Sequence, residues 1–353
     1  MENQNEITSV EKAVFIYRQI IRKKIVALTA LIAGTLLCFF LNVVIGSTTI
    51  SLSAILSALA GDENTTLHTV IWDIRLPMAC MAILAGAGFS ICGCEMQTIL
   101  GNPMASPYTL GISAAAAFGA AAGIILDINI LGIPSNLLVT ANSFLFALAA
   151  SFLIYRFSAW HQSKRHIIIL FGIALNFIFN AFTMFLQYIA DENKLQSLIF
   201  WSFGSLSKST WEKTVILAIV FLFTFFFLLH HSWKLTALTL NDQKALSLGV
   251  DVYQLRCHVI ILVSLLTATA VCFVGTIGFL GLVAPHLARG LTGEDQRFLL
   301  PVSALFGAFI LSVASMLSKI LISGALLPVG LITSFIGIPF FIILIFSQGR
   351  KSL

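Results

Sequence analysis

The stretch HIIILFGIALNFIFNAFTMFLQYIA, residues 166–190, runs for 25 residues without a single Asp, Glu, Lys or Arg. A helix needs about 20 apolar residues to cross a hydrocarbon core roughly 30 Å thick, so this stretch is long enough to span a membrane. The whole chain has the same character, because 58% of its 353 residues are hydrophobic and only 10% are charged. The sequence therefore predicts an integral membrane protein with no room for a soluble catalytic domain.

Apolar segments of this kind recur along the chain. They are predicted at residues 25–45, 76–100, 108–126, 136–156, 166–190, 214–233, 256–275, 279–290, 299–321 and 328–347. We expect an all-α polytopic membrane protein with about ten transmembrane helices in one bundle. Residues 25–347 would form a single transmembrane domain, with a cytoplasmic segment at 1–24 before it and a cytoplasmic tail at 348–353 after it.

The distribution of positive charge predicts the orientation. Of the 20 Lys and Arg residues, 15 fall in one set of alternate connectors, and five fall in the other, at Arg75, Lys194, Lys208, Lys213 and Lys319. Connectors rich in Lys and Arg stay in the cytoplasm, so both termini are predicted to be cytoplasmic. The net charge of +5 therefore reports topology, and no nucleic-acid partner is expected. Segment 279–290 is short, but treating it as re-entrant would force one terminus outside.

One narrow polar stripe crosses the segment 166–190. Its members, at offsets of 0, 4, 7 and 11 along the chain, are Asn176, Asn180, Thr183 and Gln187. At 100° per residue these positions fall within about 60° of one another on a helix. Polar side chains at this depth face protein or a cavity rather than lipid. The residues alone leave two functions open, the lining of a solute pathway and hydrogen bonding between helices.

Small residues and one carboxylate mark the segment 76–100. Spacings of three and four separate Ala82, Gly86, Ser90, Gly93 and Gln97, which predicts a helix face that neighbouring backbones approach closely. The carboxylate is Glu95, about one turn from the cytoplasmic end. A coupling role for Glu95 would make the chain an ion-coupled secondary transporter, which is the competing class of function.

The connector 234–255 is the longest on the predicted inner side. It contains a possible short helix that begins after Asn241 or Asp242 and ends at Gly249, a residue favoured at helix C-termini. Ala245, Leu246 and Leu248 form its weakly apolar side. Exposed Leu side chains on a small helix indicate docking of another protein, whereas a helix lying on the membrane surface would be longer and more basic.

Missing motifs also limit the function. The dipeptide Gly-Lys does not occur, so the chain has no P-loop, and it has no His-Glu-x-x-His zinc motif. The six cysteines lie in or beside apolar segments, where a thiol behaves as a small hydrophobe. We expect no metal site, no cofactor and no enzymatic activity. If ATP drives transport, a separate chain hydrolyses it.

Five stretches together resemble the FecCD/BtuC-type permeases, the membrane subunits of type II ABC importers for iron-siderophores, haem and cobalamin. The matching stretches are RLP at 75–77, GCEMQTILGNPMASPYTLGISAAAAFGA at 93–120, LNDQKALSLGV at 240–250, VGTIGFLGLVAPHLAR at 274–289 and LPVGLITSFIGIPFFIILI at 327–345. They occur in the family's order and cover nearly the whole chain from about residue 70. The first 24 residues match no family stretch.

The resemblance implies a homodimer or pseudo-dimer of ten-helix subunits in a bacterial or archaeal cytoplasmic (inner) membrane. Its partners would be two copies of an ABC ATPase and a periplasmic or lipid-anchored substrate-binding protein. In relatives the fifth helix lines the pathway, which favours that role for the polar stripe. The loop at 240–250 would be the ATPase-coupling element, with Leu240, Asp242, Ala245, Leu246, Leu248 and Gly249.

The resemblance also implies docking of the binding protein on outer basic residues. The matching positions are Arg75 and Lys319, whereas Met78 replaces a second family Arg and Leu326 replaces an acidic residue often found before the LPVG-like motif. For the cargo, an iron complex such as a ferric siderophore leads, because it is the commonest in the family. Cobalamin, haem and an oxyanion remain alternatives, since cargo cannot be taken from fold.

Overall fold

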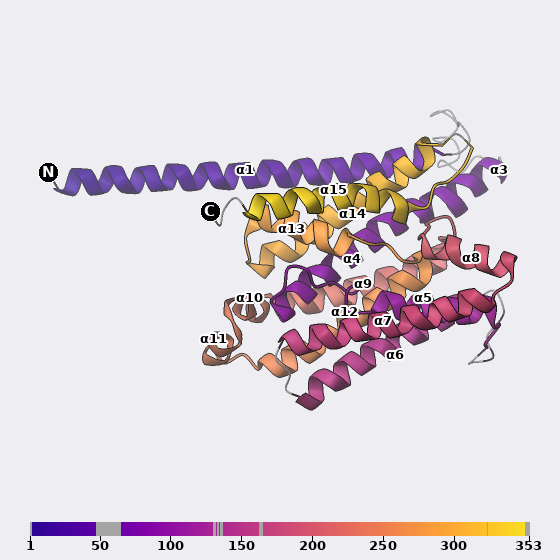
Figure 1. The fold of residues 1–353 in the computed structure, drawn as a ribbon. Coiled ribbons are helices and arrows are strands. Elements are labelled where there is room, and N and C mark those ends of the chain that lie inside the picture. Colours follow the sequence, from indigo (N-terminus) through magenta and orange to yellow (C-terminus); the bar gives the residue numbers. More distant parts are fainter. Residues whose placement is uncertain are drawn as a thin grey trace.

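The computed structural model of the chain describes residues 2–46, 65–129, 132, 134, 137–161, 165–322 and 324–349. All regular secondary structure in these ranges is helical. The helices, labelled as in Figure 1, are α1 (Glu2–Val44), α3 (Thr65–His68), the π-helix η1 (Thr69–Arg75), α4 (Leu76–Leu100), α5 (Ile112–Ile125), α6 (Leu138–His161), α7 (Arg165–Ile189), α8 (Glu192–Ser202), α9 (Trp211–His230), α10 (Ser232–Leu240), α11 (Asp242–Ser247), α12 (Val252–Val274), α13 (Leu280–Thr292), α14 (Gln296–Ile320) and α15 (Val329–Gly349).

Seven helical stretches of the described ranges are long and apolar enough to cross a membrane. They are α1 from Lys24 onward, the stretch from Thr66 to Leu100, and the helices α6, α7, α9, α12 and α14. Two shorter apolar helices, α5 and most of α15, join them. With α13, these helices coincide with the predicted apolar segments, and the all-helical multi-pass fold is confirmed. That all ten segments cross the membrane remains a prediction.

Helix α1 differs from the expected domain boundary at residue 25. It is one continuous helix of 43 residues from Glu2 to Val44, and its first half projects beyond the bundle in Figure 1. No Gly or Pro occurs between residues 2 and 33, and Glu, Gln, Lys and Arg are good helix formers. Polarity alone therefore marks where the membrane is predicted to begin, because nothing in the sequence ends the helix there.

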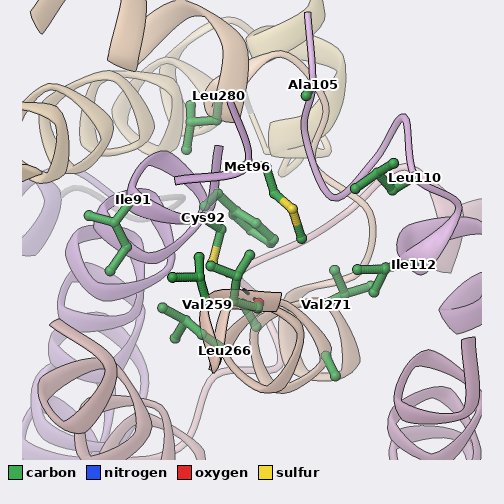
Figure 2. Close-up of a cluster of buried hydrophobic side chains, with 14 of the residues drawn as sticks. Ile91, Cys92, Met96, Ala105, Leu110, Ile112, Val259, Leu266, Val271 and Leu280 are labelled. Carbon is green, nitrogen blue, oxygen red and sulfur yellow. Dashed lines mark hydrogen bonds between the residues drawn. The ribbon is translucent and has the colours of Figure 1, made fainter. Parts of the chain in front are cut away.

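Helix α4 packs tightly through small residues, as predicted. A Cβ added to Gly86 or to Gly93 would collide with the backbone of Gly307 in α14 or of Gly281 in α13. Between them the Ser90 hydroxyl donates to the Ser303 carbonyl oxygen at 2.6 Å. Backbones at such close approach gain van der Waals contact and interhelical hydrogen bonds. Figure 2 shows part of the adjoining core, where side chains of α4 and α12 meet: Ile91, Cys92, Met96, Val259, Leu266 and Val271.

The two ends of the bundle carry different elements. In Figure 1 the start of α1, the end of α15, and helices α10 and α11 lie toward one end, whereas α3 and α8 lie toward the other. The chain therefore begins and ends on the side of the connector 234–255, which agrees with an even number of crossings. We call this side inner and the opposite side outer, following the charge distribution.

Candidate functional site

The connector 101–111 leaves the helical conformation inside the bundle. Helix α4 ends at Gly101, whose φ of 57° lies in the left-handed region that glycine favours, and α5 begins only at Ile112. The 14 residues of α5 rise about 21 Å, less than the roughly 30 Å of a hydrocarbon core. If α5 crosses the membrane as predicted, part of the connector lies at membrane depth, where non-helical backbone is tolerated only inside protein or beside a water-filled cavity.

A cavity of about 390 Å³ lies beside this connector. We call it the hydroxyl cavity, because all of its polar lining side chains carry hydroxyls, those of Ser106, Tyr108, Thr109, Ser113, Ser202, Thr267, Thr276 and Ser334. Phe89, Phe203 and Phe279 supply aromatic walls, and none of its lining residues is charged. A wall of uncharged hydroxyls and aromatic rings can hold a solute by several weak contacts and release it again.

Two more cavities continue from the hydroxyl cavity toward the inner side. The α7 cavity, of about 370 Å³, shares Tyr108 and Thr109 with the hydroxyl cavity and is also lined by Asn176. The inner cavity, of about 570 Å³, shares Asn102 with the α7 cavity. Its further lining residues include Arg165, Leu240, His286 and Arg289. The connector 101–111 thus contributes to all three cavities, which follow one another along the bundle.

The polar stripe of α7 meets this route at one residue. Asn176 donates from Nδ2 to the Tyr108 carbonyl oxygen at 2.9 Å, and Asn180 donates to Asn176 Oδ1. The Thr183 hydroxyl bonds to the Phe179 carbonyl oxygen of its own helix at 2.8 Å. Asn180, Thr183 and Gln187 line none of the three cavities, and all three are at least partly exposed on this single chain. Their role in a pathway remains a prediction.

The hydroxyl cavity was not predicted from the sequence, and the predicted helix 108–126 was too long by four residues at its start. The chain carries Gly101, Pro103, Pro107 and Gly111 in this connector, and these residues mark turns rather than a helix. The connector between α12 and α13 carries a similar signal, because residues 275–281 include three glycines. Phe279 there has a φ of 65°, which non-glycine residues rarely adopt. The Gly and Pro residues clustered in these two connectors were the sequence signal that could have indicated the cavity.

Glu95 lies apart from the cavities. Its side chain is completely buried, and neither carboxylate oxygen has a hydrogen-bond partner among the described residues. It lines none of the three cavities. The described part of the chain also holds no cluster of three or more His, Cys, Asp or Glu residues suited to a metal ion. A solute or ion in these cavities would not contact Glu95.

The predicted short helix on the inner side is confirmed as α11. Asn241 caps it, since its Oδ1 accepts a bond from the Lys244 amide at 2.8 Å, and Gly249, with a φ of 80°, follows its end. Leu246 is 59% and Leu248 50% exposed, whereas Ala245 is fully buried. Ala245 therefore faces the bundle, and the two Leu side chains, with Leu240 at 55%, are available to a partner.

Asp242, the first residue of α11, forms an ionic cluster with two arginines from other helices. Its Oδ1 accepts a bond from Arg165 Nε at 2.9 Å, and its Oδ2 accepts one from Arg256 Nη2 at 3.0 Å. Burial by itself would raise the pKa of the Asp242 carboxyl, but the bonds from Arg165 and Arg256 outweigh it and hold the pKa below its ordinary value. The carboxylate is therefore charged at neutral pH. We call these three residues the inner cluster.

The outer basic residues Arg75 and Lys319 are buried against the end of α1. Arg75 Nη1 donates to the carbonyl oxygens of Val43 at 2.9 Å and Val44 at 2.7 Å. Lys319 Nζ donates to the Asn42 carbonyl oxygen at 2.7 Å and to Asn42 Oδ1 at 3.1 Å. These bonds supply donors to carbonyls that a helix end leaves unpaired. We call this group the outer cluster; a contact with a binding protein remains a prediction.

Comparison with known proteins identifies the class. Residues 34–347 match the FecCD transport family, and the chain belongs to this family. It is therefore a multi-pass membrane permease subunit of a type II ABC importer, a class that works with an ATPase and a substrate-binding protein. The resemblance seen in the five sequence stretches is confirmed.

Relatives that carry different cargoes are about equally similar to the chain. The hemin transport system permease protein of Yersinia pestis is 35% identical, covering 82% of this chain and 87% of its own. The molybdate import system permease protein of Haemophilus influenzae is also 35% identical, covering 80% and 83%. The vitamin B12 import system permease protein of Vibrio vulnificus is 33% identical, covering 78% and 82%.

A solved structure agrees with the fold. A metal-chelate type ABC transporter, described in an inward-facing conformation, matches with a TM-score of 0.78 and 32% identity. The match covers 90% of this chain and 99% of that chain. The helical arrangement described above is therefore that of an ABC transporter membrane subunit.

Proposed function

We propose that the chain, as a homodimer in a bacterial or archaeal cytoplasmic membrane, forms the translocation pathway for an iron complex such as a ferric siderophore. A substrate-binding protein delivers the complex on the outer side. Two copies of a separate ATPase drive its passage from the inner side. The proposal narrows the class established for the family to one cargo, one assembly and one location.

The observation that carries the proposal is the row of three cavities along the connector 101–111. The hydroxyl cavity has no charged lining residue, so a bulky complex would be held there by weak, replaceable hydrogen bonds and aromatic contacts. The inner cavity is lined by Arg165 and Arg289, whose charges are balanced by Asp242 and by Glu294, which also lines it. Its guanidinium and amide groups would offer hydrogen bonds to a carboxylate-bearing chelate on its way out. A route lined first by hydroxyls and aromatic rings and then by paired charges and amides suits a large chelate that is held weakly and released.

Two further features support the proposed ATPase partner and the proposed homodimer. Leu240, Leu246 and Leu248 are at least half exposed around α11, and exposed large apolar side chains on a short helix suit burial in a groove of an ATPase. The α7 cavity opens beside Phe177, which is 72% exposed on the single chain. A second copy packed near this face would close the route from the lipid side.

Reconstitution tests this function. The permease, the ATPase and the binding protein are purified separately and combined in proteoliposomes, and uptake of ferric siderophore, haem, cobalamin and molybdate is measured in parallel. We expect uptake that requires ATP and the binding protein, highest for a ferric siderophore. Tryptophan quenching and native mass spectrometry of the binding protein identify its ligand independently. Higher uptake of haem than of the siderophore would overturn the siderophore assignment, and highest uptake of cobalamin or molybdate would overturn the iron assignment. Uptake driven by an ion gradient without the ATPase would overturn the whole proposal.

A further inference from the structure

The inner cluster joins the ATPase-facing helix to several membrane helices through one carboxylate. Asp242 is the first residue of α11, Arg165 is the first residue of α7, and Arg256 lies in the first turns of α12. Both arginines bond to the Asp242 carboxylate. Asp242 is thus the point where the inner ends of three helices meet.

Each arginine also contacts a further element. Arg256 Nε donates to the Ile99 carbonyl oxygen at 3.1 Å, in the last turn of α4. Arg165 Nη2 donates to the Leu238 carbonyl oxygen at 3.0 Å, near the end of α10. The Arg165 guanidinium also lies directly over Gly101, where α4 ends and the connector 101–111 begins. A shift of Asp242 would therefore move groups on the connector that lines the cavities.

Burial makes this connection stiff. The Arg256 side chain is only 7% exposed and that of Arg165 22%. A guanidinium taken out of water is costly unless a carboxylate stays with it. Each arginine makes two bonds to the carboxylate: Arg165 Nε and Nη2 both donate to Oδ1, and Arg256 Nη2 donates to both oxygens. Several charge-assisted bonds restrict the orientation of the groups. The two arginines should therefore follow Asp242 when α11 is displaced, rather than exchange it for water.

The junction between α10 and α11 is held in an uncommon backbone conformation. Asn241 has a φ of 151° and a ψ of 171°, a region that residues other than glycine rarely occupy. Asn241 Oδ1 accepts the cap bond from the Lys244 amide, and Arg165 bonds to the Leu238 carbonyl oxygen three residues earlier in the chain. Such strain persists where the surroundings over-determine the conformation, and it is common at switch regions. The junction at residue 241 therefore depends on the contacts around it, among them those of the inner cluster.

We propose that Asp242 is a positioning residue that transmits the movement of α11 to Arg165 at the inner cavity and to the inner end of α7. The proposal rests on the proposed function, because it needs an ATPase seated on α11. Arg165 lines the inner cavity, so its displacement changes the width and charge of the inner mouth. Hydrolysis of ATP and opening of the inner cavity are linked through this carboxylate.

The test measures coupling separately from assembly. Asp242→Asn keeps the shape and the capacity to accept hydrogen bonds but removes the charge, and Asp242→Glu keeps the charge. The matched control is Asp295→Asn, since the Asp295 carboxylate forms an ion pair with Arg297 at the start of the same helix and lies on the same side. For each variant one measures melting temperature, co-purification of the ATPase, ATP hydrolysis and uptake in proteoliposomes.

We expect Asp242→Asn to retain the ATPase and to hydrolyse ATP, while uptake per ATP hydrolysed falls about tenfold, within the range of measured coupling between sites. Asp242→Glu should recover part of the ratio, and Asp295→Asn should leave it unchanged. Arg165→Lys is a second variant in case Asp242→Asn does not fold. It keeps one charge but loses the forked geometry, so the ratio should fall in the same direction.

Two outcomes would overturn the inference. One is an unchanged ratio of uptake to hydrolysis in folded Asp242→Asn and Arg165→Lys. The other is a proportional loss of uptake, hydrolysis and melting temperature, which a purely structural role produces. Both outcomes presuppose ATP-driven uptake by the wild-type assembly, so a wild-type assembly without such uptake would instead mean that the proposed function is wrong.

Discussion

The inner and outer clusters both contain basic side chains, but these side chains bind different kinds of acceptor. Each joins two basic side chains from separate helices. In the inner cluster, Arg165 and Arg256 converge on a carboxylate on a short connecting helix. In the outer cluster, Arg75 and Lys319 donate to backbone carbonyls at the end of α1 and to the Asn42 side chain. The first joins side chain to side chain, whereas the second mostly joins side chain to backbone.

This difference indicates which cluster can move. A carboxylate on α11, a helix of six residues between two connectors, can shift with a partner that binds it. The carbonyls of Asn42 and Val43 belong to a 43-residue helix that is also tied to α14, because Asn42 Nδ2 donates to the Ser312 carbonyl oxygen at 2.9 Å. We infer that the inner cluster transmits motion and that the outer cluster fixes α1 to the bundle.

The largest effect is expected at the partner side of the inner cluster. Replacing Leu246 and Leu248 with Asp places charge where a partner would bury apolar surface, so co-purification of the ATPase should be lost completely. Gln254→Asp, at an exposed position near the start of α12, adds charge outside α11 and should not disturb the complex. Size-exclusion chromatography of the permease alone checks folding. Full recovery of the complex in the double Leu variant would show that the ATPase does not dock on α11.

The next prediction tests whether the outer cluster fixes α1 to the bundle. Lys319→Met removes a charged donor from buried acceptors on Asn42, which costs about 1.5–3 kcal/mol of stability. The melting temperature in detergent should fall, and Arg75→Met should act in the same direction. Lys208→Met, at a more exposed outer position, is the matched control.

The competing role of the outer cluster is docking of the binding protein. In that case Arg75 and Lys319 variants would keep their stability, but the binding protein would associate more slowly and with a flatter salt dependence. Surface plasmon resonance over a salt series separates the two roles. Unchanged stability together with slower association would show that the outer cluster does not fix α1 and that the docking prediction is right.

The sequence predicted the helical framework better than the cavities. Long uncharged stretches and the small residues Gly86 and Gly93 report burial directly, and α11 has its cap at Asn241 and its stop at Gly249. The hydroxyl cavity depends instead on where the connectors 101–111 and 275–279 fold back into the bundle. Single Ser and Thr residues far apart in sequence carry no periodic signal. Contacts such as Asp242 with Arg165, 77 residues away, also need the tertiary structure.

A smaller effect concerns the stripe that continues from the inner cluster along α7. In a background without the six native cysteines, Cys at position 176 should react with small polar thiol reagents, and its labelling should change when the ATPase binds nucleotide. Cys at position 175, a buried neighbour, is the control and should stay unreactive. Positions 180 and 187 test the rest of the stripe. If positions 176, 180 and 187 stay unreactive in every state, the pathway does not follow this face.

The smallest effect is expected at Glu95, which belongs to neither cluster. Its carboxylate is buried without a hydrogen-bond partner among the described residues, so Glu95→Gln should change stability by no more than about 1 kcal/mol. ATP-driven uptake should also be unchanged. Glu212→Gln, at an exposed position in the first turn of α9 that lines none of the three cavities, serves as the comparison. Loss of uptake only in Glu95→Gln would favour coupling through this carboxylate.

The contrast between the two clusters is tested most directly by uptake per ATP hydrolysed, measured side by side for Asp242→Asn and Lys319→Met in proteoliposomes containing equal amounts of folded permease. We predict a low ratio for Asp242→Asn at normal stability, and a normal ratio for Lys319→Met at reduced stability. A normal ratio in Asp242→Asn together with a low ratio in Lys319→Met would contradict the assignment of transmission to the inner cluster and of fixation to the outer one.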